Sequence, residues 1–194
     1  MRGPIGEDDV EQLEATALTD EAHSQAAATL LGWAEERHPQ DAVPPAALLN
    51  AAAWHLQSAG MPEQVLDLHR RAVAAPGQVP PDARCYLHGA LLTAGRIGEA
   101  QELAEAIRRS APMDTDVYLF VAENYELAGN LEQAHRWLTM GAERIERTDR
   151  EDLPADGFGA FTLLRARRRV RDGLGQPVDA LDDLVPPVQS LTEE

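Results

Sequence analysis

Three residues in the middle of the chain have side chains that can bind a metal ion or act in nucleophilic chemistry. Cys85 and His88 stand three positions apart, which places them on one face of a helix, and His69 falls in the preceding predicted helix. Cysteine and histidine are common zinc ligands. The same residue types also occur in closely packed helical interiors, where free cysteine is usually buried. We therefore expect a core role, with a metal or nucleophilic site as the alternative. The other histidines show no ligand spacing: His23, His38, His55 and His135.

A second group with chemical potential is a run of arginines near the C-terminus. Residues 158–173 contain five arginines and one aspartate, in a chain whose net charge is -16. At 100° per residue one side of this predicted helix is apolar, with Leu163, Ala166, Val170 and Leu174. The opposite side holds Phe161, Arg165, Arg168 and Arg169. Guanidinium groups bind carboxylates in bidentate geometry. The pattern predicts either a docking surface for an acidic partner or a solvated face partly neutralised by Asp179, Asp182 and Asp183.

Several classes of chemistry are excluded by residue types that the chain lacks. All 17 basic residues are arginine, so a Schiff-base lysine and the phosphate-binding lysine of a P-loop are absent. The single cysteine excludes an intramolecular disulfide and a multi-cysteine zinc site. Serine-hydrolase, metalloprotease, dinucleotide and calcium-loop motifs are also missing. We expect a protein that is not an enzyme and holds no cofactor.

A repeated spacing of glycines indicates the elements that position these residues. Gly60, Gly95 and Gly129 each separate two helical runs, and they lie 35 and 34 residues apart. Glycine ends helices easily because it adopts the left-handed conformation without strain. A period near 34 built from a helix, a glycine turn and a helix is the signature of the tetratricopeptide repeat.

The side-chain pattern of the third unit follows that repeat. Tyr118, Val121-Ala122 and Tyr125 occupy the motif positions of its first helix, and Ala134 that of its second. The chain therefore resembles the tetratricopeptide-repeat (TPR) family over residues 44–146. Its C-terminal part is similar to small high-GC bacterial TPR proteins. Some of those carry a cysteine-rich SEC-C metal-binding tail, which this chain lacks.

The resemblance implies an all-α fold, a right-handed superhelical stack of antiparallel helix pairs, or α-solenoid. We expect residues 1–43 to form N-terminal capping helices, including one from Asp20 to His38. Residues 44–147 are expected to form three TPR-like helix pairs. Residues 148–185 would add a loop and a degenerate helix pair, and residues 186–194 a frayed tail.

In the TPR family the first helix of each unit lines a concave groove that binds a peptide. Transferred to this chain, the groove positions are Asn50, Trp54, Gln57, Cys85, Leu92, Leu119, Glu123 and Glu126. None is cationic, which argues against the capture of an acidic C-terminus that the family is known for. Trp54 is either an anchor for a ligand, since tryptophan is enriched at binding hot spots, or a packing residue between first helices.

Charge and hydropathy limit the partners. A net charge of -16 repels nucleic acid and anionic membranes. No apolar run is long enough to span a bilayer, and the N-terminus has no apolar signal region, so we expect a cytoplasmic protein. The favoured function is a non-catalytic scaffold that binds a protein or peptide through the groove or the arginine helix. The alternatives are a self-assembling structural protein, as a homo-oligomer, and a metal-dependent enzyme.

Overall fold

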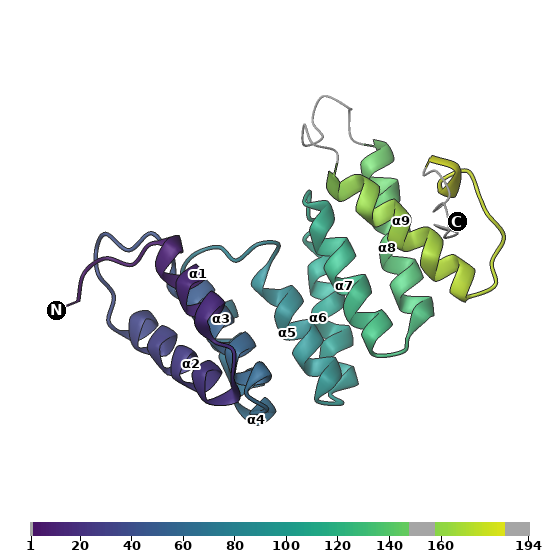
Figure 1. Cartoon of the computed structure of the whole chain (residues 1–194). Helices are drawn as coiled ribbons and strands as arrows, with labels where there is room; N and C mark the ends of the chain where they lie inside the picture. The colour runs from purple at the N-terminus through teal and green to yellow at the C-terminus, as the bar shows by residue number, and fades with distance from the viewer. Residues whose placement is uncertain (1, 148–157, 185–194) are drawn as a thin grey trace, which may run out of the picture. The chain divides into compact units, whose positions relative to one another are not determined.

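The computed structural model describes residues 2–147 and 158–184, and over these residues the chain is all-α, without a strand (Figure 1). The helices are α1 (Glu7–Thr16), α2 (Asp20–Glu35), α3 (Pro45–Ser58), α4 (Pro62–Ala74), α5 (Ala83–Thr93), α6 (Ile97–Arg109), α7 (Thr115–Leu127), α8 (Leu131–Arg147), α9 (Phe158–Gly173) and the short 3-10 helix η1 (Asp182–Leu184). The all-α prediction is confirmed. Contacts divide the chain into two compact units, Met1–Ala106 and Ile107–Glu194.

The N-terminal unit is built from helices that pack on their neighbours in the chain. α3 packs against both α2 and α4, and α4 packs against α5. Leu30, Leu48 and Leu68, one from each of α2, α3 and α4, are buried in one apolar core. Ala52 and Ala53 lie in the same core, where their small side chains let the helices approach closely.

The C-terminal unit contains α7, α8 and α9, each in contact with the other two. α7 and α9 run side by side in the same direction. The evidence is that contacts near both of their ends join residues with the same separation in sequence, 43 positions. Near the N-terminal ends Asp116 lies against Gly159, and near the C-terminal ends Arg169 forms an ion pair with Glu126. Parallel neighbours separated by an antiparallel helix are the arrangement expected of successive first helices in a repeat protein.

Four helices end in the same hydrogen-bonded turn. Gly60, Gly95, Gly129 and Gly175 have φ angles of 70°, 70°, 75° and 66°. In each turn the N–H of the residue after glycine donates to a carbonyl five residues back, for example Arg96 to Leu91 and Gln176 to Arg171. This is the Schellman motif, which the left-handed conformation of glycine permits. The repeated glycine turn therefore extends to the end of α9.

Two predicted boundaries need correction. α2 ends at Glu35 rather than His38, because the N–H of His38 donates to the Asp41 carboxylate instead of continuing the helix. After Gly175 a second helix does not form before η1, because carboxylate oxygens of Asp179 and Asp182 bond backbone N–H groups of this segment and turn toward arginines of α9. The predicted loop at 148–157 and tail at 186–194 lie outside the described residues.

Candidate functional site

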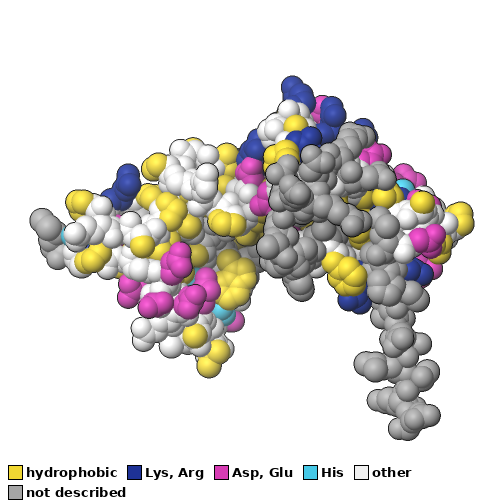
Figure 2. Space-filling view, turned by 90° about the horizontal axis from the view of Figure 1, so that it is seen from above, with side chains coloured by type: hydrophobic (Ala, Val, Ile, Leu, Met, Phe, Trp, Pro, Cys, Tyr) yellow, Lys and Arg dark blue, Asp and Glu magenta, His cyan; other side chains and the backbone are white. Residues whose placement is uncertain are grey.

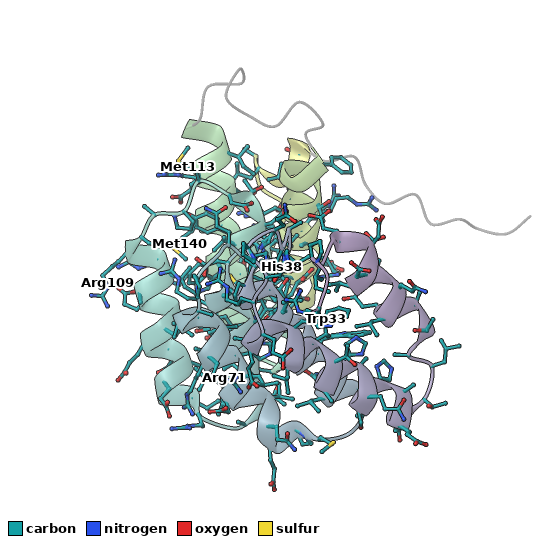
Figure 3. All side chains as sticks on the ribbon, turned by 90° about the vertical axis from the view of Figure 1, so that its left-hand side faces the viewer. Trp33, His38, Arg71, Arg109, Met113 and Met140 are labelled. Atoms are coloured by element: carbon teal, nitrogen blue, oxygen red, sulfur yellow. The ribbon has the colours of Figure 1, made fainter. Side chains whose placement is uncertain are left out.

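Of the three tryptophans, Trp54 has the most exposed side chain. Trp137 is buried and contacts the ring of Tyr118. Trp33, on the C-terminal part of α2 (Figure 3), is half-buried against the N-terminal core. Trp54, on α3, is 49% exposed. A large aromatic ring left open on a helix surface is a candidate anchor for a binding partner.

Two histidines hold Trp54 in place. Its ring makes edge contacts with the rings of His23 on α2 and His55 on α3, at centroid distances of 5.4 Å and 4.8 Å. These contacts restrict the rotation of the indole, so the exposed part of the ring is presented in one orientation. A preorganised aromatic side chain loses little entropy when a partner binds.

The two histidines are themselves hydrogen-bonded across α2 and α3, with 2.8 Å between their Nδ1 atoms. One ring must donate and the other accept, so at least one imidazole is neutral. His55 is 0% exposed, and its Nε2 has no hydrogen-bond partner among the described residues. Burying a bare acceptor nitrogen costs less than burying an unpaired N–H, so His55 is assigned as the Nδ1–H donor. Burial and the neighbouring His23 lower the pKa of His55.

The other predicted groove residues of the N-terminal unit differ in how far their side chains are exposed. Gln57, one turn after Trp54 on α3, is exposed. Asn50, one turn before Trp54, is half-buried, and its Oδ1 is buried without a hydrogen-bond partner in the described part of the chain. Leu92 is buried, with 9% of its side chain exposed. Leu92 therefore offers little surface to a partner, and its assignment to the groove stays a prediction.

His69 on α4 and both Cys85 and His88 on α5 are buried, as the core interpretation predicts. Burial lowers the pKa of both His69 and His88 to about 4, so both rings are neutral at pH 7. His69 stacks on Tyr86 with 6.1 Å between ring centroids. Within residues 2–147 and 158–184, no group of three or more His, Cys, Asp or Glu side chains is placed to hold a metal ion.

In the C-terminal unit the predicted site residues of two helices come together. Leu119, Glu123 and Glu126 belong to α7, and Glu126 bonds the guanidinium of Arg169 on α9 at 2.7 Å. The groove positions themselves hold no cationic residue, but a cation from α9 reaches one of them, Glu126. Desolvation and the carboxylate of Glu126 raise the pKa of Glu123. Arg165 lies over the ring of Phe161, with its Cζ 5.5 Å from the centroid, and Arg168 is half-buried.

Two largely buried arginines of α9, Arg167 and Arg171, are not among the predicted site residues. Arg167, 2% exposed, donates to Asp179 and Asp182 at 2.9 Å and 2.6 Å, and Asp182 is itself 1% exposed. Arg171 donates to Asp182 and also to the carbonyl of Pro177. The hydrogen bonds from Arg167 lower the pKa of Asp179 well below its usual range. The predicted neutralisation of the arginine helix by the chain's own aspartates exists at Arg167 and Arg171, and Arg169 is paired with Glu126.

The sequence contains a signal for Arg167 and Arg171 but none for the contact between His23 and His55. Arg167 and Arg171 are four positions apart and flank the apolar stripe, so a charge at that border indicates a partner that covers it. His23 and His55 are far apart in the sequence, and only the packing of α2 on α3 brings them together. No local spacing predicts that pair.

In the part of the chain that the structure describes, no helix is long and apolar enough to cross a membrane. Comparison with known proteins identifies no relative: no protein-family model matches the chain, and neither a curated protein nor a solved structure has significant similarity to it.

Proposed function

We propose that the protein is a non-catalytic interaction module that binds a peptide or protein segment at the Trp54 surface. This name denotes Trp54 and Gln57 on α3, the half-buried His23 on α2 that contacts Trp54, and Met61 in the α3–α4 turn, which Ser24 of α2 contacts. The observation that carries the proposal is a half-exposed tryptophan fixed by two ring contacts. Anchors of this kind, large and rigid and partly open, supply most of the binding energy of protein interfaces.

The proposal includes a TPR-like architecture in which these helices form successive pairs. The spacing of Gly60, Gly95 and Gly129, their equivalent Schellman turns, and the parallel course of α7 and α9 all favour it. Stacked helix pairs expose a long surface of first helices, and α3 would contribute Trp54 to it.

Affinity capture with the tagged protein from the lysate of its own source tests the function. The variants are Trp54→Ala and the triple change of Arg165, Arg168 and Arg169 to Glu. Leu18→Ala is the matched control, since it truncates another exposed apolar side chain, 84% exposed, on the same unit. We expect a partner that the unaltered protein, the Leu18 variant and the arginine variant retain and the Trp54 variant loses.

Other results redirect or reject the proposal. A partner lost only from the triple arginine variant moves the binding site to α9. Recovery of the protein alone from every lysate favours the self-assembling alternative. A partner that all variants retain equally would show that neither surface is the site.

A further inference from the structure

The N-terminal unit has an excess of negative charge that its own arginines do not neutralise. Residues 1–106 contain 6 arginines and 16 acidic residues. Five of these arginines are already in ion pairs: Arg2 with Asp41, Arg70 and Arg96 with Glu99, Arg71 with Glu35, and Arg84 with Asp82. Figure 2 shows acidic side chains gathered on this unit, in the left half of the view, next to hydrophobic ones.

No arginine of the unit is available near Trp54. Arg37, the sixth arginine, makes no ion pair among the described residues, and it follows the C-terminal end of α2. His23, which contacts Trp54, lies in the first turns of the same helix. The two ends of a helix of this length are on the order of 20 Å apart, which is beyond reach of a side chain. Among the described residues of the N-terminal unit, no arginine without an ion pair therefore lies near Trp54.

Two exposed carboxylates that form no ion pair among the described residues, Asp20 and Glu63, are close in sequence to His23 and Met61. Asp20 is exposed and precedes His23 by three residues, so both side chains lie on one side of α2. Ser24, four residues after Asp20, contacts the sulfur of Met61 at 3.8 Å, which brings this side of α2 to the α3–α4 turn. Glu63, in the first turn of α4, is also exposed. The surface thus combines an open aromatic ring, a 38% exposed methionine and carboxylates.

We infer that the Trp54 surface recognises a cationic segment of a protein partner, in which an arginine or lysine side chain packs on the Trp54 ring while Asp20 is its counter-ion. Tryptophan is the strongest aromatic partner for a cation, and a carboxylate at the same site adds a charge-assisted hydrogen bond. Met61 contacts an apolar neighbour of the cationic residue. The uncompensated charge of the unit accelerates the approach of such a segment.

A binding assay with three labelled peptides tests this inference. They share one sequence with a single leucine and differ at three positions, which hold arginine, glutamine or glutamate. Fluorescence anisotropy at about 150 mM salt, where the Debye length is about 8 Å, reduces attraction by distant charges. The variants are Trp54→Ala and Asp20→Asn. Their matched controls are Leu18→Ala, another exposed apolar truncation, and Glu14→Gln, which removes an exposed carboxylate of α1 that has no ion pair.

We expect the arginine peptide to bind and the glutamine and glutamate peptides to bind at least about tenfold more weakly. Trp54→Ala and Asp20→Asn should each weaken binding of the arginine peptide by about fivefold or more, and the two controls by less than about twofold. Equal losses for Asp20→Asn and Glu14→Gln would mean general charge attraction and would overturn the inference. Absence of measurable binding by the arginine peptide would also overturn it.

The inference rests on the proposed function. The assay therefore distinguishes a result that rejects only the cationic partner from one that rejects binding at the Trp54 surface. If the glutamine peptide binds as tightly as the arginine peptide and Trp54→Ala abolishes both, the surface is a binding site for an apolar segment, and only the cation is rejected. If the free protein is a dimer that Trp54→Ala dissociates, the occupant is a second copy, and the cationic partner is rejected. If no peptide binds and no captured partner depends on Trp54, both proposals fall.

Discussion

At the scale of single residues, the buried histidines make the stability of the N-terminal unit depend on pH. Burial lowers the pKa of His69 and His88 to about 4, whereas an unfolded histidine titrates near 6.5. Between these values the unfolded chain binds more protons than the folded one, so stability is highest above pH 6.5 and falls as the pH drops toward 4. Each histidine accounts for about 3 kcal/mol of this loss.

Substitution of His69 tests this prediction. His69→Leu and His69→Gln remove the titrating group while keeping a side chain of similar size beside Tyr86. Urea unfolding at pH 7 and at pH 4.5 should then show a smaller loss of unfolding free energy than in the unaltered protein, by about 2 to 3 kcal/mol. The glutamine variant controls for the change to an apolar side chain. An unchanged pH dependence in both variants would contradict the assignment of His69 as a buried neutral ring.

At the scale of elements, the ion pairs of Arg167 with Asp179 and Asp182 hold the segment after Gly175 against α9. Arg167→Met would leave the buried carboxylate of Asp182 without its closest cation, which typically costs about 3 to 5 kcal/mol. Arg165→Met is the matched control. It changes an exposed arginine on the same helix whose contact with Phe161 contributes about 1 kcal/mol or less. Chemical unfolding of both variants checks the difference, and equal small effects would show that the network does not stabilise the unit.

Element boundaries were predictable wherever glycine or a capping residue sets them. The helix ends before Gly60, Gly95 and Gly129 follow from the sequence, because the left-handed turn favours glycine. The helix predicted after Gly175 does not form, for a different reason. The expected helix contains Asp179 and Asp182, and tertiary ion pairs with arginines of α9 outweigh its local helical preference. Trp54 was identified from its type, but its histidine contacts depend on packing between α2 and α3.

At the scale of the whole molecule, charge opposes self-association. A formal charge of -16 repels a second copy, and three arginines of the basic helix α9 are paired within their own unit. Arg167 and Arg171 pair with aspartates of their own unit, and Arg169 pairs with Glu126. The self-assembling alternative needs these arginines to meet acidic surface on another molecule. The compensation therefore weakens the case for self-assembly through α9.

Analytical ultracentrifugation over a range of concentration and salt tests this expectation. We expect a mass near 21.1 kDa at low and at high salt, unchanged when Arg165, Arg168 and Arg169 are replaced by Glu. Attraction between the basic helix and an acidic surface would be strongest at low salt, because screening shortens its range to about 3 Å at 1 M. A mass that rises with concentration at low salt, and returns to the monomer value in the triple variant, would establish the self-assembling alternative instead. A salt-independent dimer would point to an apolar interface, and Trp54→Ala in the same experiment would show whether the Trp54 surface forms it.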